Sequence, residues 1–309
     1  MSDKKLEREK GWEEISKLLD AQLHEVKETL RGISNLIIEK KISLSKEEKD
    51  TVIDADDVVM GTSHFRKLID ELYKNGGRET VIKSGQEVCQ GMVNLLLDVA
   101  RKTKPYLEEC NKLAEMTANV GSHSSGRYAA APARGDQNEI EAQKQKVASM
   151  GKELKTSMED KFDTFVRENH DKAQKFLTAV NKKSLWPKIL KGVGIALLAL
   201  AIVPLVIGAL FFLKSAGAPS SIGPSASRAR NNSRGNSSAA QSSRSALFFS
   251  EMKEKMMRRI QMAANPGAAQ ENQRREEERK LKNDYVTQQR DRAQKEMAVL
   301  NSAMRRPGS

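Results

Sequence analysis

The chain has 309 residues, of which 30% are charged and 5% are aromatic, and its formal net charge is +12. Its two cysteines are too few for a disulfide framework, and two thiols alone do not make a zinc site. This composition excludes a small disulfide-stapled secreted domain and favours polar, elongated helices over one large core. The soluble parts are therefore expected to face a reducing, cytoplasmic compartment.

Residues 1–120 are predicted to form a bundle of three or four α-helices. The first helix carries apolar residues at steps of three and four, namely Trp12, Ile15, Leu19, Leu23, Val26, Leu30, Ile33 and Ile37. Ser45 followed by Glu48 has the spacing of a capping box and predicts the start of a second helix. Two glycines in KNGGRE end that helix, and Pro105 is expected to interrupt or restart a third. Amphipathic helices joined by short turns favour an all-α bundle.

Residues 121–137 have the composition of a linker, and residues 138–185 are predicted to form a second long amphipathic helix. Its apolar positions are Val147, Met150, Leu154, Met158, Phe162, Phe165, Val166, Ala173, Phe176, Leu177 and Val180. Because this helix leads toward a strongly apolar segment, it is expected either to act as a stalk or to pack onto the first bundle. Both interpretations stay open at this point.

Residues 192–213 contain no charged or strongly polar side chain, and 14 of these 22 residues are Leu, Ile, Val or Phe. A helix rising ~1.5 Å per residue reaches ~33 Å over this stretch, which is enough for a hydrocarbon core of ~30 Å. Eighteen or more consecutive apolar residues are typical of a membrane span. We therefore predict one transmembrane helix within residues 186–214.

The residues around this segment fit a membrane-anchoring role. Trp186 is expected at the membrane–water interface, with Lys188 and Lys191 on the near side and Lys214 on the far side. Pro204 lies near the middle and lacks a backbone donor, which favours a kink. Two geometries stay open, a single span and a shallow hairpin bent at the proline. A single span is preferred, because a bend within lipid leaves backbone polar groups unsatisfied.

The chain from residue 215 onward is basic, with 18 basic and 9 acidic residues. Residues 215–245 are rich in Ser, Gly, Pro and Asn and are predicted to be a disordered linker, and residues 246–309 are predicted to form amphipathic and charged helices. The first of these helices has an apolar face and basic flanks, made of Phe249, Met252, Lys253, Lys255, Met256, Arg258, Arg259 and Ile260. An anionic membrane surface, the protein's own bundle and a partner's groove all stay open as its binding surface.

The expected partners are anionic membrane lipids and an unknown protein bound through helical surfaces, and homo-oligomerisation stays open. Basic residues close to a membrane are attracted to anionic lipid by ~1 kcal/mol each. Nucleic acid is the competing anion, but the tail shows no aromatic stacking platform, zinc finger or other reading module. No nucleic-acid binding is therefore expected.

No catalytic, cofactor or metal site is predicted. Asp54, Asp56 and Val58 formally match the DxDx[TV] pattern of haloacid-dehalogenase-like phosphotransferases, in which the first aspartate is the nucleophile. In that family the motif ends a buried strand, whereas here it follows SKEEKD, which is typical of an exposed helix start. The four histidines are scattered without metal spacing. The sequence favours a membrane-anchored interaction or tethering protein, with an enzyme in the N-terminal bundle and a membrane-shaping hairpin as alternatives.

The layout resembles that of the coiled-coil-plus-transmembrane effectors that intracellular bacteria deliver through type IV secretion. The shared features are Lys/Glu-rich helices, an internal hydrophobic segment, a polar C-terminal tail and the block RREEERK at residues 274–280. The acidic block of such effectors lies near the C-terminus, whereas here it lies about 30 residues from the end and the final MRRPGS is basic. The resemblance implies a host organelle membrane and a role in altering host membrane traffic.

Overall fold

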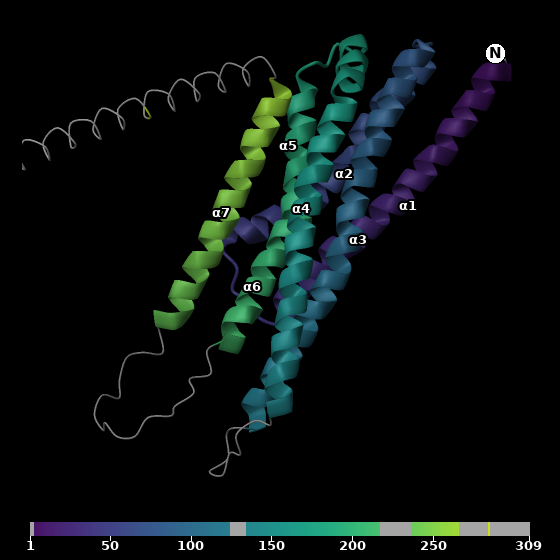
Figure 1. Ribbon diagram of the computed structural model, residues 1–309. Coiled ribbons are helices and arrows are strands. Elements are labelled where there is room, and N and C mark those ends of the chain that lie inside the picture. Colours follow the sequence, from purple (N-terminus) through teal and green to yellow (C-terminus); the bar gives the residue numbers. More distant parts are fainter. Residues whose placement is uncertain (1–2, 124–133, 217–235, 266–283, 285–309) are drawn as a thin grey trace, which may run out of the picture. The chain divides into compact units, whose positions relative to one another are not determined.

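The computed structural model describes residues 3–123, 134–216, 236–265 and 284 (Figure 1). Its regular elements within these ranges are all helical, which confirms the predicted all-α fold. They are α1 (Asp3–Glu39), α2 (Lys46–Lys74), α3 (Glu79–His123), α4 (Arg134–Ala179), α5 (Leu185–Leu197), the π-helical segment η1 (Leu198–Ile202), α6 (Val203–Ala216) and α7 (Asn236–Ala264). The chain divides into two units, residues 1–260 and 261–309, and the contacts described below lie in the first.

Helix α1 buries the apolar face that its periodicity predicts, and α2 also buries an apolar face. The buried members are Trp12, Leu19, Leu23, Val26, Leu30, Ile33, Val52, Val59, Phe65, Leu68 and Ile69. Ile15 differs from the prediction, because 38% of it is exposed. Trp12 Nε1 donates a hydrogen bond of 2.6 Å to Asp70 Oδ1 and so joins α1 to α2. The predicted capping box is confirmed, since Glu48 N donates to Ser45 Oγ at 3.3 Å and Ser45 N donates to Glu48 Oε2 at 2.6 Å.

The glycine pair ends α2 as predicted. Gly76 has a φ of +67°, a conformation that glycine adopts without strain, and Gly77 N donates to Leu72 O at 2.8 Å. The interruption expected at Pro105 is not observed, because α3 continues through it. Burial of apolar side chains on both sides of the proline, such as Val99 and Tyr106, offsets the lost backbone hydrogen bond.

The predicted linkers are shorter in the structure. Helix α3 extends to His123 and α4 begins at Arg134, and residues 124–133 lie outside the described part. Residues 236–245, which we expected in the disordered linker, belong to α7. The residues from Asn236 to 245 contain no Gly or Pro, so averaging composition over the whole linker concealed this helix start. Residues 217–235 and most of the charged helix predicted beyond residue 268 lie outside the described residues.

Helix α4 packs along α3, so it does not stand free as a stalk. Its buried side chains include Val147, Leu154, Met158, Phe162, Phe165, Ala173, Phe176 and Leu177. A tight turn ends α4, in which Asn181 has a φ of +54° and Lys182 N donates to Leu177 O at 2.7 Å. The turn directs α5 back along α4, and the two helices are antiparallel (Figure 1).

Candidate functional site

Helices α5, η1 and α6 form one continuous helical stretch, here called the apolar helix. Its residues Leu185–Phe212, 28 in number, make the one helix in the described ranges that is long and apolar enough to cross a membrane. Central helices of soluble helical proteins can have the same length and composition, so the surroundings of the helix matter. In this structure 72% of its most apolar 18-residue stretch is buried inside the protein.

Five other helices contact the apolar helix, including α1, which contacts η1. α5 packs against α2. The segments η1 and α6 both pack against α3, and α4 contacts α5, η1 and α6 (Figure 1). α7 covers α5 near Gly194, whose Cα faces the side chain of Ile260. The residues buried by these contacts include Trp186, Leu190, Val193, Leu197, Leu198, Leu200, Ile202, Val203, Val206, Ile207 and Phe211. The apolar helix therefore has a protein environment on most sides.

The predicted anchor residues divide into buried and exposed groups. Trp186 is fully buried, with its ring centre 6.2 Å from those of both Phe165 and His170. Lys188 and Lys191 are exposed, Pro204 is buried, and the side chain of residue 214 lies outside the described part. Nε1 of the tryptophan has no hydrogen-bond partner among the described residues. A buried donor without a hydrogen-bond partner costs about 1–3 kcal/mol. Burial of this indole therefore destabilises the covered form, which is the conformation in which the other helices enclose the apolar helix.

Pro204 leaves a backbone carbonyl without its usual helical partner, and α3 supplies a replacement. An α-helical N–H bonds to the carbonyl four residues earlier, which for position 204 is that of Leu200. Thr103 Oγ1, fully buried on α3, lies 2.5 Å from Leu200 O and 2.9 Å from Val99 O. The backbone around the proline widens into η1, where Val203 N donates to Leu198 O. The hydroxyl therefore satisfies a polar group at the middle of the apolar helix.

Tyr106 of α3 fits between two glycines on neighbouring helices. A Cβ built on Gly208 of α6 would lie 2.0 Å from the Tyr106 hydroxyl oxygen, and one on Gly151 of α4 would lie 3.3 Å from its ring. Burial raises the pKa of Tyr106, and it also raises the pKa of Cys110 to about 12, as it does for Cys89. The two thiols are therefore protonated and unreactive at neutral pH.

The helix predicted to lie on a lipid surface is docked on the protein in this structure. Its apolar residues Phe249, Met252, Met256 and Ile260 are all buried. Basic residues beside them form ion pairs with α2 and α4: Lys253 with Glu47, Lys255 with Glu159 at 2.9 Å, and Arg259 with Glu159 at 3.3 Å and with Asp163 at 3.5 Å. Arg258 pairs within α7, with Glu254 at 2.6 Å. Of the three binding surfaces considered for this helix, the structure shows it packed on the protein's own bundle rather than on a membrane or in a partner's groove.

The cover leaves an apolar groove of about 240 Å³ open beside α5. It lies among α2, α3 and α5, and the residues that line it are Val58, Gly61, Thr62, His64, Phe65, Leu68, Met92, Leu96, Leu185, Lys188, Ile189, Gly192 and Val193. Part of the apolar helix therefore already contacts solvent through this groove.

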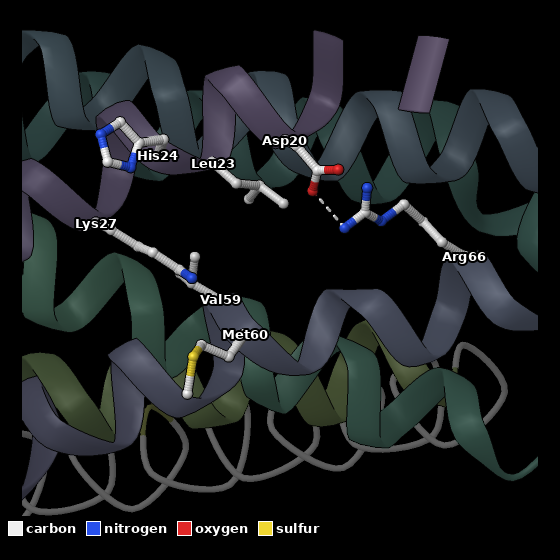
Figure 2. A pocket seen from close by; sticks show the side chains of 7 residues that line it. All are labelled: Asp20, Leu23, His24, Lys27, Val59, Met60 and Arg66. Atoms are coloured by element: carbon white, nitrogen blue, oxygen red, sulfur yellow. Dashed lines mark hydrogen bonds and ion pairs between the residues drawn. The ribbon is translucent and has the colours of Figure 1, made fainter. Parts of the chain in front are cut away.

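A second pocket of about 160 Å³, between α1 and α2, contains the ion pair of Arg66 and Asp20 (Figure 2). Arg66 contacts Asp20 Oδ1 at 2.6 Å and donates to Ser16 Oγ at 3.1 Å. The hydrogen bond that the Arg66 guanidinium donates to Asp20 raises the pKa of Arg66. His24 and Lys27 lie on the other side of the pocket, and no nucleophile is paired with a base here. The geometry is that of a surface ion pair and does not indicate catalysis.

The structure does not bring the aspartates of the DxD pattern into a catalytic setting. Asp54 is exposed and Asp56 half-buried in the middle of α2, and the described residues contain no strand that the motif could end. Within the same residues no group of three or more His, Cys, Asp or Glu side chains is placed to hold a metal ion.

Glu109 joins α3 to α4 and gives the covered form a testable pH dependence. Gln143 Nε2 donates to Glu109 Oε2 at 2.8 Å, and Lys112 and Lys146 lie 2.9 and 3.0 Å from Oε1. These contacts, the Gln143 hydrogen bond first, lower the pKa of Glu109 to about 2 from a usual value of 4.5. A carboxyl group with a lower pKa in the folded than in the unfolded protein stabilises the fold at pH values above its unfolded-state pKa. This contribution is lost as the pH falls toward the folded-state pKa of the same group.

We expect Glu109→Gln to flatten the loss of stability between about pH 4.5 and pH 2, because the glutamine cannot titrate. The contribution should be about 1 kcal/mol, since both lysines are largely exposed and solvent screens them. Urea unfolding at pH 7 and pH 3 measures it. An equal drop in the free energy of unfolding for variant and unmodified protein would contradict this assignment.

No protein-family model matches the chain, and neither curated proteins nor solved structures show a significant match to it. The residues around the apolar helix are therefore the basis for inferring its function.

The sequence interpretation missed three contact residues of this site, Thr103, Gly194 and Gly208. The two glycines were given no role in packing. Small residues within an apolar helix also mark places where another helix approaches closely, and that signal was present in the sequence. Thr103 carries no such signal, because its role depends on a proline about 100 residues away.

Proposed function

We propose that this protein is a membrane-inserting helical tether, which keeps its apolar helix covered until it meets a bilayer. The observation that carries the proposal is a helix of membrane-spanning length enclosed by amphipathic helices whose outer faces are charged. On insertion the helix exchanges its protein cover for lipid, and the separated helices become available to protein partners. This form of the proposal gives both the apolar helix and the helices around it a role.

The charged exterior supports a change of structure on insertion. Ion pairs link the covering helices on their outer faces, including Arg101–Glu25 at 2.9 Å, Lys102–Glu153 at 3.3 Å and Lys172–Glu87 at 2.8 Å. A basic or acidic side chain at the centre of a bilayer costs about 2.5–3.5 kcal/mol on the insertion scale. Moving the whole covered assembly into lipid would bury many such groups, so the covering helices must move away from the apolar helix first.

Lipid and the protein cover both remove the apolar helix from water. Each Leu, Ile, Val or Phe gains ~0.3–0.6 kcal/mol in lipid, or about 4–8 kcal/mol for the 14 of residues 192–213. The protein cover removes most of the same side chains from water. Two polar groups act in opposite directions in the covered form: Trp186 Nε1 lacks a hydrogen-bond partner there, whereas Leu200 O has one.

Fluorescence of Trp186 tests insertion directly. The chain has two tryptophans, so Trp12→Phe leaves Trp186 as the single emitter. We expect vesicles with brominated acyl chains to quench it, and unbrominated vesicles to leave it bright, because an interfacial indole lies next to the acyl chains. The bound protein should also resist a carbonate wash.

An unquenched tryptophan together with full release by carbonate would overturn the proposal. That result would favour a second candidate function, a soluble helical interaction protein in which the apolar helix is a permanent core. The observation in favour of this second candidate is the 72% burial of the apolar stretch.

The layout shared with type IV secretion effectors extends the proposal to a host organelle membrane, where the tether would alter membrane traffic. A tagged copy produced in a eukaryotic cell should then co-fractionate with one organelle. A uniform cytosolic distribution would remove this extension and leave the vesicle result unaffected.

A further inference from the structure

Helix α7 covers the apolar helix through a mixed surface. Phe249, Met252, Met256 and Ile260 are 1–4% exposed and form its buried face. The flanking cations Lys253, Lys255 and Arg259 pair with Glu47, Glu159 and Asp163 of α2 and α4. The cation of Lys155 on α4 lies 5.7 Å from the centre of the Phe248 ring. Apolar and electrostatic contacts therefore hold α7 in place together.

The docking of α7 depends on the absence of a side chain at Gly194. A Cβ at this position would lie 2.5 Å from Ile260 Cδ1 and 3.5 Å from Met256 Cγ. α7 contacts its neighbours through side chains, and its backbone packs closely against none of the other described helices. Removal of α7 would therefore expose the face of α5 around Gly194 with little disturbance of the remaining helix–helix contacts.

We propose that α7 is an exchangeable cover, because an anionic membrane surface binds the same apolar and basic residues of α7 that hold it on α5. Binding of α7 to such a membrane and covering of the apolar helix then exclude each other. The inference rests on the proposed membrane function and adds the partner surface that uncovers the helix.

The chemistry of the two surfaces supports the exchange. On the protein, three cations pair with three carboxylates. The Lys253–Glu47 pair is largely exposed and contributes little, whereas Arg259 and Glu159 are only 22% and 16% exposed and are partly desolvated by their pairing. On an anionic leaflet the same cations meet many phosphates and carboxylates, and their attractions add. The buried face of four apolar residues fits the boundary of headgroups and acyl chains as an amphipathic helix does. Lipid therefore replaces both kinds of contact that the protein supplies.

Alanine at position 194 provides the first test. Gly194→Ala should weaken the docking of α7, because Ile260 Cδ1 must move away from the new Cβ, and should raise binding to vesicles of 70% phosphatidylcholine and 30% phosphatidylserine by ~2-fold. Gly32→Ala is the matched control, since a Cβ there meets nothing within 4 Å and helix propensity rises equally. Adding Ile260→Val removes the contacting Cδ1 and should return binding to the original level. Equal binding by Gly194→Ala and the control would overturn the inference.

A crosslink supplies the opposite test. Glu159→Cys and Lys255→Cys replace a pair whose Oε1 and Nζ are 2.9 Å apart, so a short, cleavable bismaleimide can join the two positions. Cys89 and Cys110 are buried and do not compete for the reagent. The locked full-length protein should lose vesicle binding and regain it when the linker is cleaved. Undiminished binding of the locked protein would contradict mutual exclusion.

The readouts separate this inference from the proposed function. Binding through α7 alone is removed by high salt, whereas insertion of the apolar helix resists carbonate and quenches Trp186. If vesicle binding is salt-sensitive and changes as expected in the Gly194 and crosslink variants, but Trp186 is not quenched, the exchange is supported and insertion is overturned. Quenching that the crosslink does not reduce supports insertion and overturns the exchange.

Discussion

Replacing Gly208 by alanine should loosen the covered form and strengthen membrane insertion at the same time. The new Cβ would lie 2.0 Å from the hydroxyl oxygen of Tyr106 and 3.2 Å from Cys110 Sγ, both buried on α3. Overpacking of this kind costs about 1–3 kcal/mol in a closed core. In a membrane-inserted helix the same substitution meets only lipid, and alanine favours the helix over glycine. The two effects shift the equilibrium in the same direction.

Two measurements on one variant check this expectation. The urea midpoint of the soluble protein should fall, and the vesicle-inserted fraction reported by Trp186 quenching should rise. Gly61→Ala is the control, because a Cβ at Gly61 of α2 has nothing within 4 Å. Tyr106→Phe removes the contacting oxygen and should restore part of the stability. If stability and insertion fell together in Gly208→Ala, the apolar helix would not exchange between protein and lipid.

Thr103→Val should destabilise the covered form by about 1–3 kcal/mol, although it keeps the shape of the side chain. The hydroxyl oxygen of Thr103 lies 2.5 Å from Leu200 O, at a point where both residues are fully buried. Without this donor the buried carbonyl loses a hydrogen bond in an apolar environment. Thr103→Ser retains the hydroxyl and should keep most of the stability.

Pro204→Ala converts this prediction into a double-mutant cycle. Alanine restores a backbone N–H and permits the α-helical register in place of η1, and in the α-helical register position 204 bonds to Leu200 O. Thr103→Val should therefore cost less in that background. Chemical unfolding of the four proteins gives the coupling free energy. Additive effects of the two substitutions would mean that the threonine acts through packing alone.

Local chemistry made much of this fold predictable. Ser45 and Glu48 satisfy each other's backbone groups over four residues, and the glycines after Lys74 allow a positive φ, so sequence alone located both ends of α2. The periodicity around Leu19 and Phe162 likewise assigned their buried faces. Such features depend on residues close in the chain, and distant contacts change them little.

The surroundings of the apolar helix were not predictable in the same way. Lipid and a protein interior both replace water with hydrocarbon, so the length and composition of the apolar helix fit both environments equally well. The contacts that show the protein environment join distant residues, as in Ile260 on Gly194 and Tyr106 on Gly208. The apolar face of α7 was equally ambiguous, because its pattern has no feature that distinguishes a bilayer from α5.

The order of helices along the chain determines the order in which they are synthesised and can fold. A ribosome finishes α1 to α4 before it makes the apolar helix, so most of the enclosing surface exists when the hydrophobic stretch emerges. The final piece, α7, follows about 2–10 s later at typical elongation rates of about 5–20 residues per second. During that interval the face around Gly194 is open to chaperones and to translocation machinery. Translation speed between residues 216 and 264 would then influence whether a newly made molecule reaches the cytosol or a membrane.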